Sequence, residues 1–136
     1  MTMRTSEEPP MMMTVLAERL QLQWFRPVSP AAGGDQPTLV LLHEALGSIG
    51  QWRDFPRSLA NATGLAVMAY DRCGFGGSQP LAAPRGLDYL ERELASLDAL
   101  LSLCAIRRPL VFGLSDGATL SLLYAATYPE RALAVI

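Results

Sequence analysis

The chain has 136 residues, of which 50% are hydrophobic and 18% are charged, and its formal net charge is -2. These values fit one compact globular domain and exclude an intrinsically disordered chain, because enough apolar surface is present to offset the conformational entropy lost on folding. The 11 basic residues, all of them arginine, are outnumbered by 13 acidic residues and form no basic patch, so no nucleic-acid partner is expected.

The sequence carries no signal for secretion, membrane insertion or metal binding. Residues 1–10 contain two glutamates and two prolines and lack the apolar core of a signal peptide, and no apolar stretch approaches about 18 residues. Cys73 and Cys104 show none of the close pairing of zinc sites or small disulfide scaffolds. We therefore expect a cytoplasmic protein without a membrane partner, metal or cofactor. Residues 1–13 are expected to be poorly ordered, and residues 14–136 to form one domain.

The hydrophobic pattern predicts alternating strands and helices. Residues 14–26 alternate apolar and polar side chains at Leu20, Leu22 and Trp24, which indicates a half-buried strand and an antiparallel start. Continuous apolar runs, typical of strands buried on both faces, occur at residues 38–42, 65–70, 110–113 and 132–136. Helical spacing occurs at residues 48–62, where Pro56 interrupts it, and at residues 87–105 and 118–128. This order predicts an α/β fold with a parallel sheet and helices on both of its faces.

The sequence Gly113-Leu114-Ser115-Asp116-Gly117 is a G-x-S-x-G motif between a predicted strand and a predicted helix. A nucleophile elbow requires this context, because the turn strains the backbone at the serine and small flanking residues let the strand and helix pass closely. Ser115 is therefore the candidate nucleophile, and Gly113 and Gly117 are the small residues. Asp116 is the alternative nucleophile, but placing Asp116 at the apex of the turn puts Leu114 two residues before it, where a small side chain is needed. We expect the Asp116 carboxylate to be a favourable charge at the helix N-terminus.

Residues 43–48, with the sequence His-Glu-Ala-Leu-Gly-Ser, directly follow the predicted strand 38–42. Attack of a serine on a carbonyl group develops negative charge on the carbonyl oxygen, so the site needs hydrogen-bond donors aimed at that oxygen. A glycine-bearing loop beside the elbow can offer one backbone N–H, and the residue after the nucleophile can offer another. We expect Ala45 and Asp116 to supply this oxyanion hole.

Together with three further segments, these motifs resemble the successive signatures of the α/β-hydrolase superfamily. The segments are Trp52-Arg53-Asp54-Phe55, residues 70–78 (Tyr-Asp-Arg-Cys-Gly-Phe-Gly-Gly-Ser) and Tyr128-Pro129-Glu130. The resemblance spans residues 14–136 and implies a three-layer αβα fold, with a mostly parallel sheet that opens with an antiparallel N-terminal hairpin. It also implies that His43, with Gly47, supports the oxyanion loop. Glu44 and Leu114 depart from the residues that many members have, and both bear on specificity.

The acid and the base that such a serine needs are missing from the sequence. The family order is serine, acid, histidine, but the 21 residues after Ser115 contain no histidine and, beyond Asp116, one carboxylate, Glu130. The single histidine, His43, is expected to hold the oxyanion loop, and Glu130 is expected in a surface ion pair beside Arg131. We therefore expect the chain to be the N-terminal half of a longer hydrolase, truncated at the sixth strand.

The function expected from this resemblance is that of a serine hydrolase acting on an ester or related small acyl substrate through an acyl-enzyme at Ser115, with the half-chain alone inactive. Two alternatives stay open: a carbon–carbon bond hydrolase or perhydrolase that uses the same site, and a non-catalytic binding or regulatory half-chain. The glycine-rich residues 71–78 are interpreted as a turn braced by Asp71 and Arg72 rather than as a phosphate loop. Cys73 is either an idle thiol or a residue at the site entrance. The oligomeric state is left open.

Overall fold

The computed structural model describes residues 8–136. The strands in this part are β1 (Met11–Val15), β2 (Glu18–Phe25), β3 (Thr38–Leu42), β4 (Val67–Tyr70), β5 (Pro109–Gly113) and β6 (Ala134–Val135). The helices are the 3-10 helix η1 (Ile49–Trp52) and the α-helices α1 (Phe55–Thr63), α2 (Tyr89–Leu103) and α3 (Asp116–Thr127). The strands and helices expected between residues 14 and 136 are present, although several of their bounds shift by a few residues.

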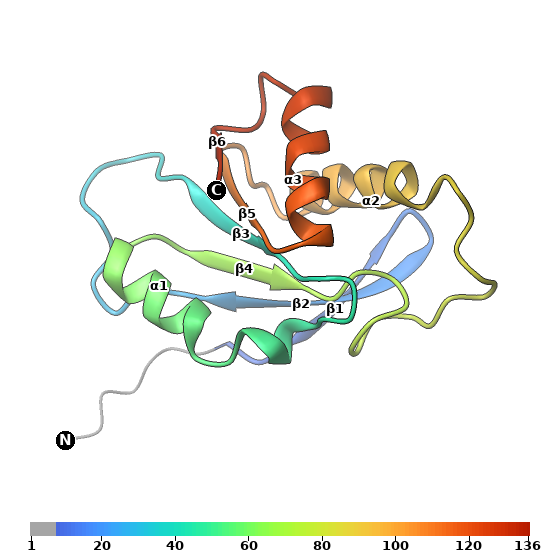
Figure 1. Ribbon diagram of the computed structural model, residues 1–136. Coiled ribbons are helices and arrows are strands. Elements are labelled where there is room, and N and C mark those ends of the chain that lie inside the picture. Colours follow the sequence, from blue (N-terminus) through green and yellow to red (C-terminus); the bar gives the residue numbers. More distant parts are fainter. Residues whose placement is uncertain (1–7) are drawn as a thin grey trace.

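The strands form one mixed sheet in the order β1-β2-β4-β3-β5-β6 (Figure 1). Strand β2 pairs antiparallel with both β1 and β4, whereas β4, β3, β5 and β6 are parallel to one another. This is the mostly parallel sheet with an antiparallel N-terminal hairpin that the resemblance implies. Leu42 at the end of β3 is in register with Gly113 at the end of β5. The loop after β3 and the turn after β5 therefore leave the sheet side by side, at the edge where open α/β sheets place their ligands.

The antiparallel hairpin begins earlier than the hydrophobic pattern predicts. Residues 11–13, which the sequence analysis assigns to the poorly ordered segment, lie in β1 and pair with residues 20–22 of β2. The two residues between the strands, Leu16 and Ala17, both have positive φ, 47° and 68°. Such turns usually carry asparagine or glycine, so this one has no sequence signal. Residues 1–7 of the segment expected to be poorly ordered lie outside the described residues.

Two hydrophobic clusters lie on opposite faces of the sheet. Alternate residues of β3 divide between them, because Val40 and Leu42 join one cluster and Leu39 and Leu41 join the other. Helices α2 and α3 cover the first cluster and α1 covers the second, as Figure 1 shows. The structure therefore confirms the three-layer arrangement expected from the sequence.

The segment expected as one interrupted helix at residues 48–62 consists of η1 and α1. They are separated near Arg53, whose φ is 50°. Pro56 lies in the first turn of α1, where proline is tolerated because its missing N–H would have no intrahelical partner. The helix ends at Gly64, which has φ 71° and donates its N–H to the carbonyl oxygen of Ala60 at 2.8 Å.

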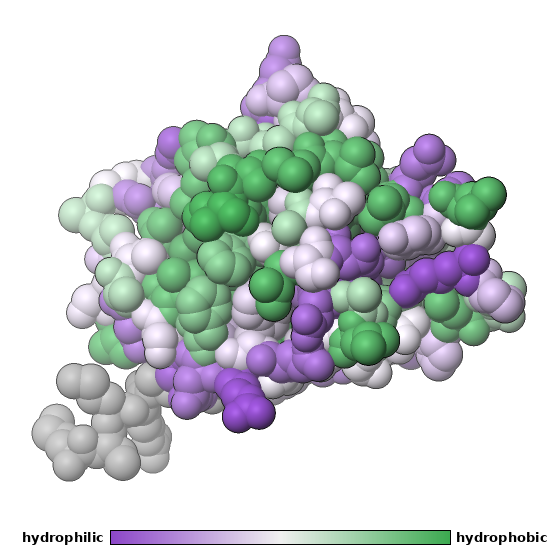
Figure 2. Space-filling model, viewed as in Figure 1, coloured by the Kyte–Doolittle hydropathy of each residue, from purple (hydrophilic) through white to green (hydrophobic). Residues whose placement is uncertain are grey.

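Exposed apolar side chains gather at one edge of the sheet. Figure 2 shows apolar side chains gathered over the part of the molecule where β5 and β6 lie. There β6 is the last strand of the sheet, and Leu133 and Ile136 are 47% and 60% exposed.

None of the described helices is long and apolar enough to cross a membrane. Residues 8–136 also contain no group of three side chains suited to hold a metal ion.

Candidate active site

The turn from β5 to α3 places Ser115 at its apex. Strand β5 ends at Gly113 and helix α3 begins at Asp116, so the turn itself consists of Leu114 and Ser115. Ser115 is exposed and has φ 56° and ψ -114°. Such a conformation costs a non-glycine residue on the order of 1–3 kcal/mol and persists only where the surrounding structure imposes it. The strained backbone expected at this serine is present.

The glycines on either side of Ser115 allow the strand and helix to approach closely. A Cβ atom at Gly117 would lie 2.1 Å from the carbonyl oxygen of Leu42, and one at Gly113 would lie 2.2 Å from the carbonyl oxygen of Gly117. Neither position can accept a side chain without a backbone shift. Helix α3 thus starts against the end of β3, and the Leu114 N–H donates to the same Leu42 oxygen at 3.1 Å. The elbow is therefore in direct contact with the start of the loop 43–48.

The loop 43–48 is organised around the carbonyl oxygen of Glu44. His43 is 1% exposed, its Nε2 atom accepts the backbone N–H of Arg72 at 3.0 Å, and its Nδ1 atom lies 2.7 Å from the Glu44 oxygen. These contacts fit a neutral imidazole that carries its proton on Nδ1, and burial lowers the pKa of His43. The N–H of Gly47 donates to the same Glu44 oxygen at 2.9 Å, and a Cβ there would lie 2.9 Å from the His43 Cβ. His43 and Gly47 thus pack together inside the loop.

Two backbone N–H groups on the segments that meet at the elbow have no acceptor within residues 8–136. They belong to Ala45, which is exposed in the loop 43–48, and to Asp116. Asp116 is the first residue of α3, where a helix leaves its N–H groups without intrahelical partners. These are the two residues that the sequence analysis expects to form an oxyanion hole. The contact between Leu114 and Leu42 brings their segments together.

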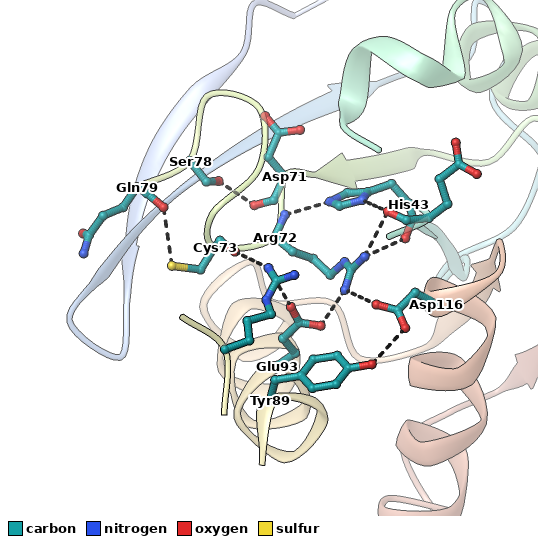
Figure 3. A network of polar contacts seen from close by, with 11 residues as sticks. His43, Asp71, Arg72, Cys73, Ser78, Gln79, Tyr89, Glu93 and Asp116 are labelled. Carbon is teal, nitrogen blue, oxygen red and sulfur yellow. Dashed lines mark hydrogen bonds and ion pairs between the residues drawn. The ribbon is translucent and has the colours of Figure 1, made fainter. Parts of the chain in front are cut away.

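Arg72 is a buried arginine that links four segments of the chain (Figure 3). Its side chain is 1% exposed, and Nη1 lies 2.6 Å from Glu93 Oε2 and 3.0 Å from Asp116 Oδ2. Its Nη2 atom donates to the carbonyl oxygens of His43 at 3.2 Å and Glu44 at 3.0 Å. From the sequence, Arg72 is expected only to brace its own loop, so this wider role was missed.

Glu93 is the sequence signal that could have revealed this network. It lies one helical turn before Leu97, on the buried face of α2, and a carboxylate on a buried face needs a cationic partner. Burial raises the pKa of the Glu93 carboxyl group, and the nearby Arg72 offsets part of that effect. Asp71 does brace its own loop, because its carboxylate accepts the Gly77 N–H at 2.8 Å. The same carboxylate also accepts the N–H of Ile49, the first residue of η1, at 2.7 Å.

The Asp116 carboxylate is held in place rather than presented at the apex of the elbow. It accepts hydrogen bonds from Arg72 Nη1 at 3.0 Å and from the Tyr89 hydroxyl at 3.2 Å. Its position in the first turn of α3 is the one expected for a favourable charge at a helix N-terminus. The strained φ falls on Ser115 and not on Asp116, so the backbone presents the serine.

A cavity of about 310 Å³ lies between α2 and the segment 79–86. Its wall includes Arg72, Cys73, Tyr89 and Glu93, but not Ser115. Cys73 therefore borders this cavity, where its Sγ atom contacts the Gln79 carbonyl oxygen at 3.4 Å.

The described residues bring no general base to Ser115. His43 is the single histidine of the sequence, and both of its ring nitrogens are engaged, Nδ1 with the Glu44 carbonyl oxygen and Nε2 with the backbone N–H of Arg72. Glu130 is exposed beyond the end of α3. The expectation that Arg131 pairs with Glu130 is wrong, because Arg131 forms its ion pair with Asp98 of α2. Helix α3 packs against α2, which brings the two residues together.

Comparison with known proteins gives one family and a set of similar structures. A family model described as alpha/beta hydrolase fold matches residues 37–136. No curated protein shows a significant match. A proline iminopeptidase of Mycobacterium smegmatis is similar with a TM-score of 0.82 at 23% identity, over 93% of this chain and 42% of that protein.

Two further solved structures are similar over nearly the whole chain. Epoxide hydrolase A of Mycobacterium thermoresistibile has a TM-score of 0.75 at 27% identity, over 96% of this chain and 38% of that one. A bacterial membrane phospholipase A has a TM-score of 0.77 at 23% identity, over 93% of this chain and 38% of that one. The chain thus spans less than half the length of each of these proteins.

Proposed function

Because the chain belongs to the alpha/beta hydrolase fold family, we propose that it is part of a serine hydrolase that forms an acyl-enzyme at Ser115. The observation that carries this proposal is the exposed serine with φ 56° at the apex of a strand-to-helix turn. The proposed substrate class is an ester or a related small acyl compound. No step in this chemistry needs a metal or an organic cofactor.

In the proposed reaction the Ser115 Oγ atom attacks the carbonyl carbon of the substrate. The carbonyl oxygen then gains negative charge, and the backbone N–H groups of Ala45 and Asp116 donate hydrogen bonds to it. A base must take the proton of Ser115, and His43 does not suit this task because it is buried with both nitrogens engaged. We assign the base to a histidine outside these 136 residues, which also protonates the leaving group before water attacks the acyl-enzyme.

Attack by the Asp116 carboxylate is the competing chemistry, because carboxylates also serve as enzyme nucleophiles. The contacts of this carboxylate with Arg72 and Tyr89, at 3.0 Å and 3.2 Å, disfavour it. The similar structures include a peptidase, an epoxide hydrolase and a phospholipase. One fold thus serves several activities, so the proposed substrate class is argued from the residues of the site and not from the fold.

A serine-reactive fluorophosphonate probe tests the proposal on the protein that contains these residues. We expect the probe to label the wild type, and Ser115→Ala to abolish labelling and lower kcat by at least about 1,000-fold. Ser102→Ala is the matched control, because Ser102 is an exposed serine on α2 and its replacement leaves both measurements unchanged.

Two outcomes would contradict the proposal. Turnover that survives Ser115→Ala but is lost in Asp116→Asn would make the carboxylate the nucleophile. A folded wild-type protein that the probe does not label and that turns over no ester would support a non-catalytic role.

A further inference from the structure

The guanidinium of Arg72 touches both segments that carry the proposed oxyanion donors (Figure 3). Its Nη2 atom donates to the Glu44 carbonyl oxygen at 3.0 Å, and its Nη1 atom donates to Asp116 Oδ2 at 3.0 Å. We propose, on the basis of the function proposed above, that Arg72 is a positioning residue that fixes the directions of the Ala45 and Asp116 N–H groups.

The Ala45 N–H belongs to the same peptide group as the Glu44 carbonyl. The described residues contain no cis peptide bond, so this group is planar and its N–H points opposite to its C=O. Holding the Glu44 oxygen against Arg72 therefore directs the Ala45 N–H away from the guanidinium. A small rotation of this one peptide group would turn the donor away from its target.

Three donors converge on the Glu44 oxygen: Arg72 Nη2 at 3.0 Å, the Gly47 N–H at 2.9 Å and His43 Nδ1 at 2.7 Å. His43 and Gly47 lie in the loop itself, so Arg72 alone ties this peptide group to another element, the end of β4. The backbone N–H of Arg72 also donates to His43 Nε2 at 3.0 Å. Both the main chain and the side chain of Arg72 therefore hold the loop 43–48.

The contact between Arg72 and Asp116 restricts the start of α3. The Asp116 carboxylate and N–H branch from one Cα atom, so fixing the carboxylate limits rotation of the peptide group that carries the N–H. Arg72 is 1% exposed, and Glu93 at 2.6 Å supplies a second negative charge from α2. Buried charges of this kind are held in one geometry, unlike exposed ion pairs, because separating them leaves a charge without a partner.

The planar shape of the guanidinium is what allows one side chain to serve both segments. Its two terminal nitrogens point in different directions, so Nη1 binds the two carboxylates while Nη2 binds the two carbonyl oxygens. A lysine carries one nitrogen at the end of a flexible chain and cannot make both sets of contacts. Arg72→Lys therefore keeps the charge but removes the link.

The test compares Arg72→Lys with Arg85→Lys. Arg85 also lies near Glu93, at 3.5 Å, but it contacts the Cys73 carbonyl rather than the loop 43–48 or Asp116. NMR relaxation gives the amide order parameters at residues 45 and 116. We expect values of about 0.85 in the wild type, a fall toward about 0.6 in Arg72→Lys, and no change in Arg85→Lys. This readout does not depend on catalysis, so it stands even if Ser115 proves not to be the nucleophile.

Kinetics of the protein that contains these residues supply the second readout. An oxyanion donor acts in the transition state, so Arg72→Lys is expected to lower kcat by about 10- to 100-fold with little change in KM. Should Arg72→Lys fail to fold, Asp116→Asn replaces it, because this variant weakens the contact with Nη1 and is expected to loosen residue 116 while residue 45 stays rigid. Order parameters unchanged at both residues in a folded Arg72→Lys protein, or at residue 116 in Asp116→Asn, would overturn the proposal.

Discussion

Replacing Gly117 with alanine is expected to destabilise the fold by about 3 kcal/mol or more. The new Cβ atom would lie 2.1 Å from the Leu42 carbonyl oxygen, 2.7 Å from the Leu42 carbonyl carbon and 2.8 Å from the His43 carbonyl oxygen. All three are backbone atoms at the end of a central strand, so no side-chain rotation relieves the overlap. Overpacking costs about 1–3 kcal/mol where side chains can adjust, and here α3 or β3 must move by about 1 Å.

Urea unfolding followed by circular dichroism measures this loss. Gly34→Ala is the control, because a Cβ at Gly34 would meet nothing within 4 Å, and its effect is expected within about 0.5 kcal/mol. Since domains are stable by about 5–15 kcal/mol, Gly117→Ala is expected to unfold at a clearly lower urea concentration. A midpoint and slope equal to those of Gly34→Ala would refute the close approach of α3 to β3.

Two further predictions concern titratable groups. Burial lowers the pKa of His43 below its ordinary 6.5, so the unfolded chain binds more protons below that pH and stability is expected to fall as the pH drops from about 7 to about 5. Urea unfolding across this range should show that the free energy of unfolding depends less steeply on pH in His43→Gln than in the wild type. An equal pH dependence in both proteins would assign the effect to another group. Burial raises the pKa of the Cys73 thiol to about 11, so iodoacetamide is expected to alkylate it much more slowly in the native protein than in urea at about pH 8. Equal rates by mass spectrometry would contradict this.

The hydrophobic pattern predicts the parallel strands well but not the first hairpin. Strands such as β3 are buried on both faces, so a continuous apolar run marks them. Strand β1 is largely exposed and its turn at residues 16 and 17 uses no glycine or asparagine, so local sequence carries little sign of it. Its pairing with β2 supplies the hydrogen bonds that make it a strand.

In the candidate site, too, local sequence predicts one part and not another. The G-x-S-x-G motif predicts the Ser115 turn, because the strain at the serine and the need for small neighbours arise from residues adjacent in the chain. The contacts of Arg72 have no such local origin, since its partners Glu93 and Asp116 lie 21 and 44 residues away. Only the strand order β4-β3-β5, with α2 and α3 on one face, brings these groups together. There a buried guanidinium must find opposite charges, because burying it alone would cost several kcal/mol.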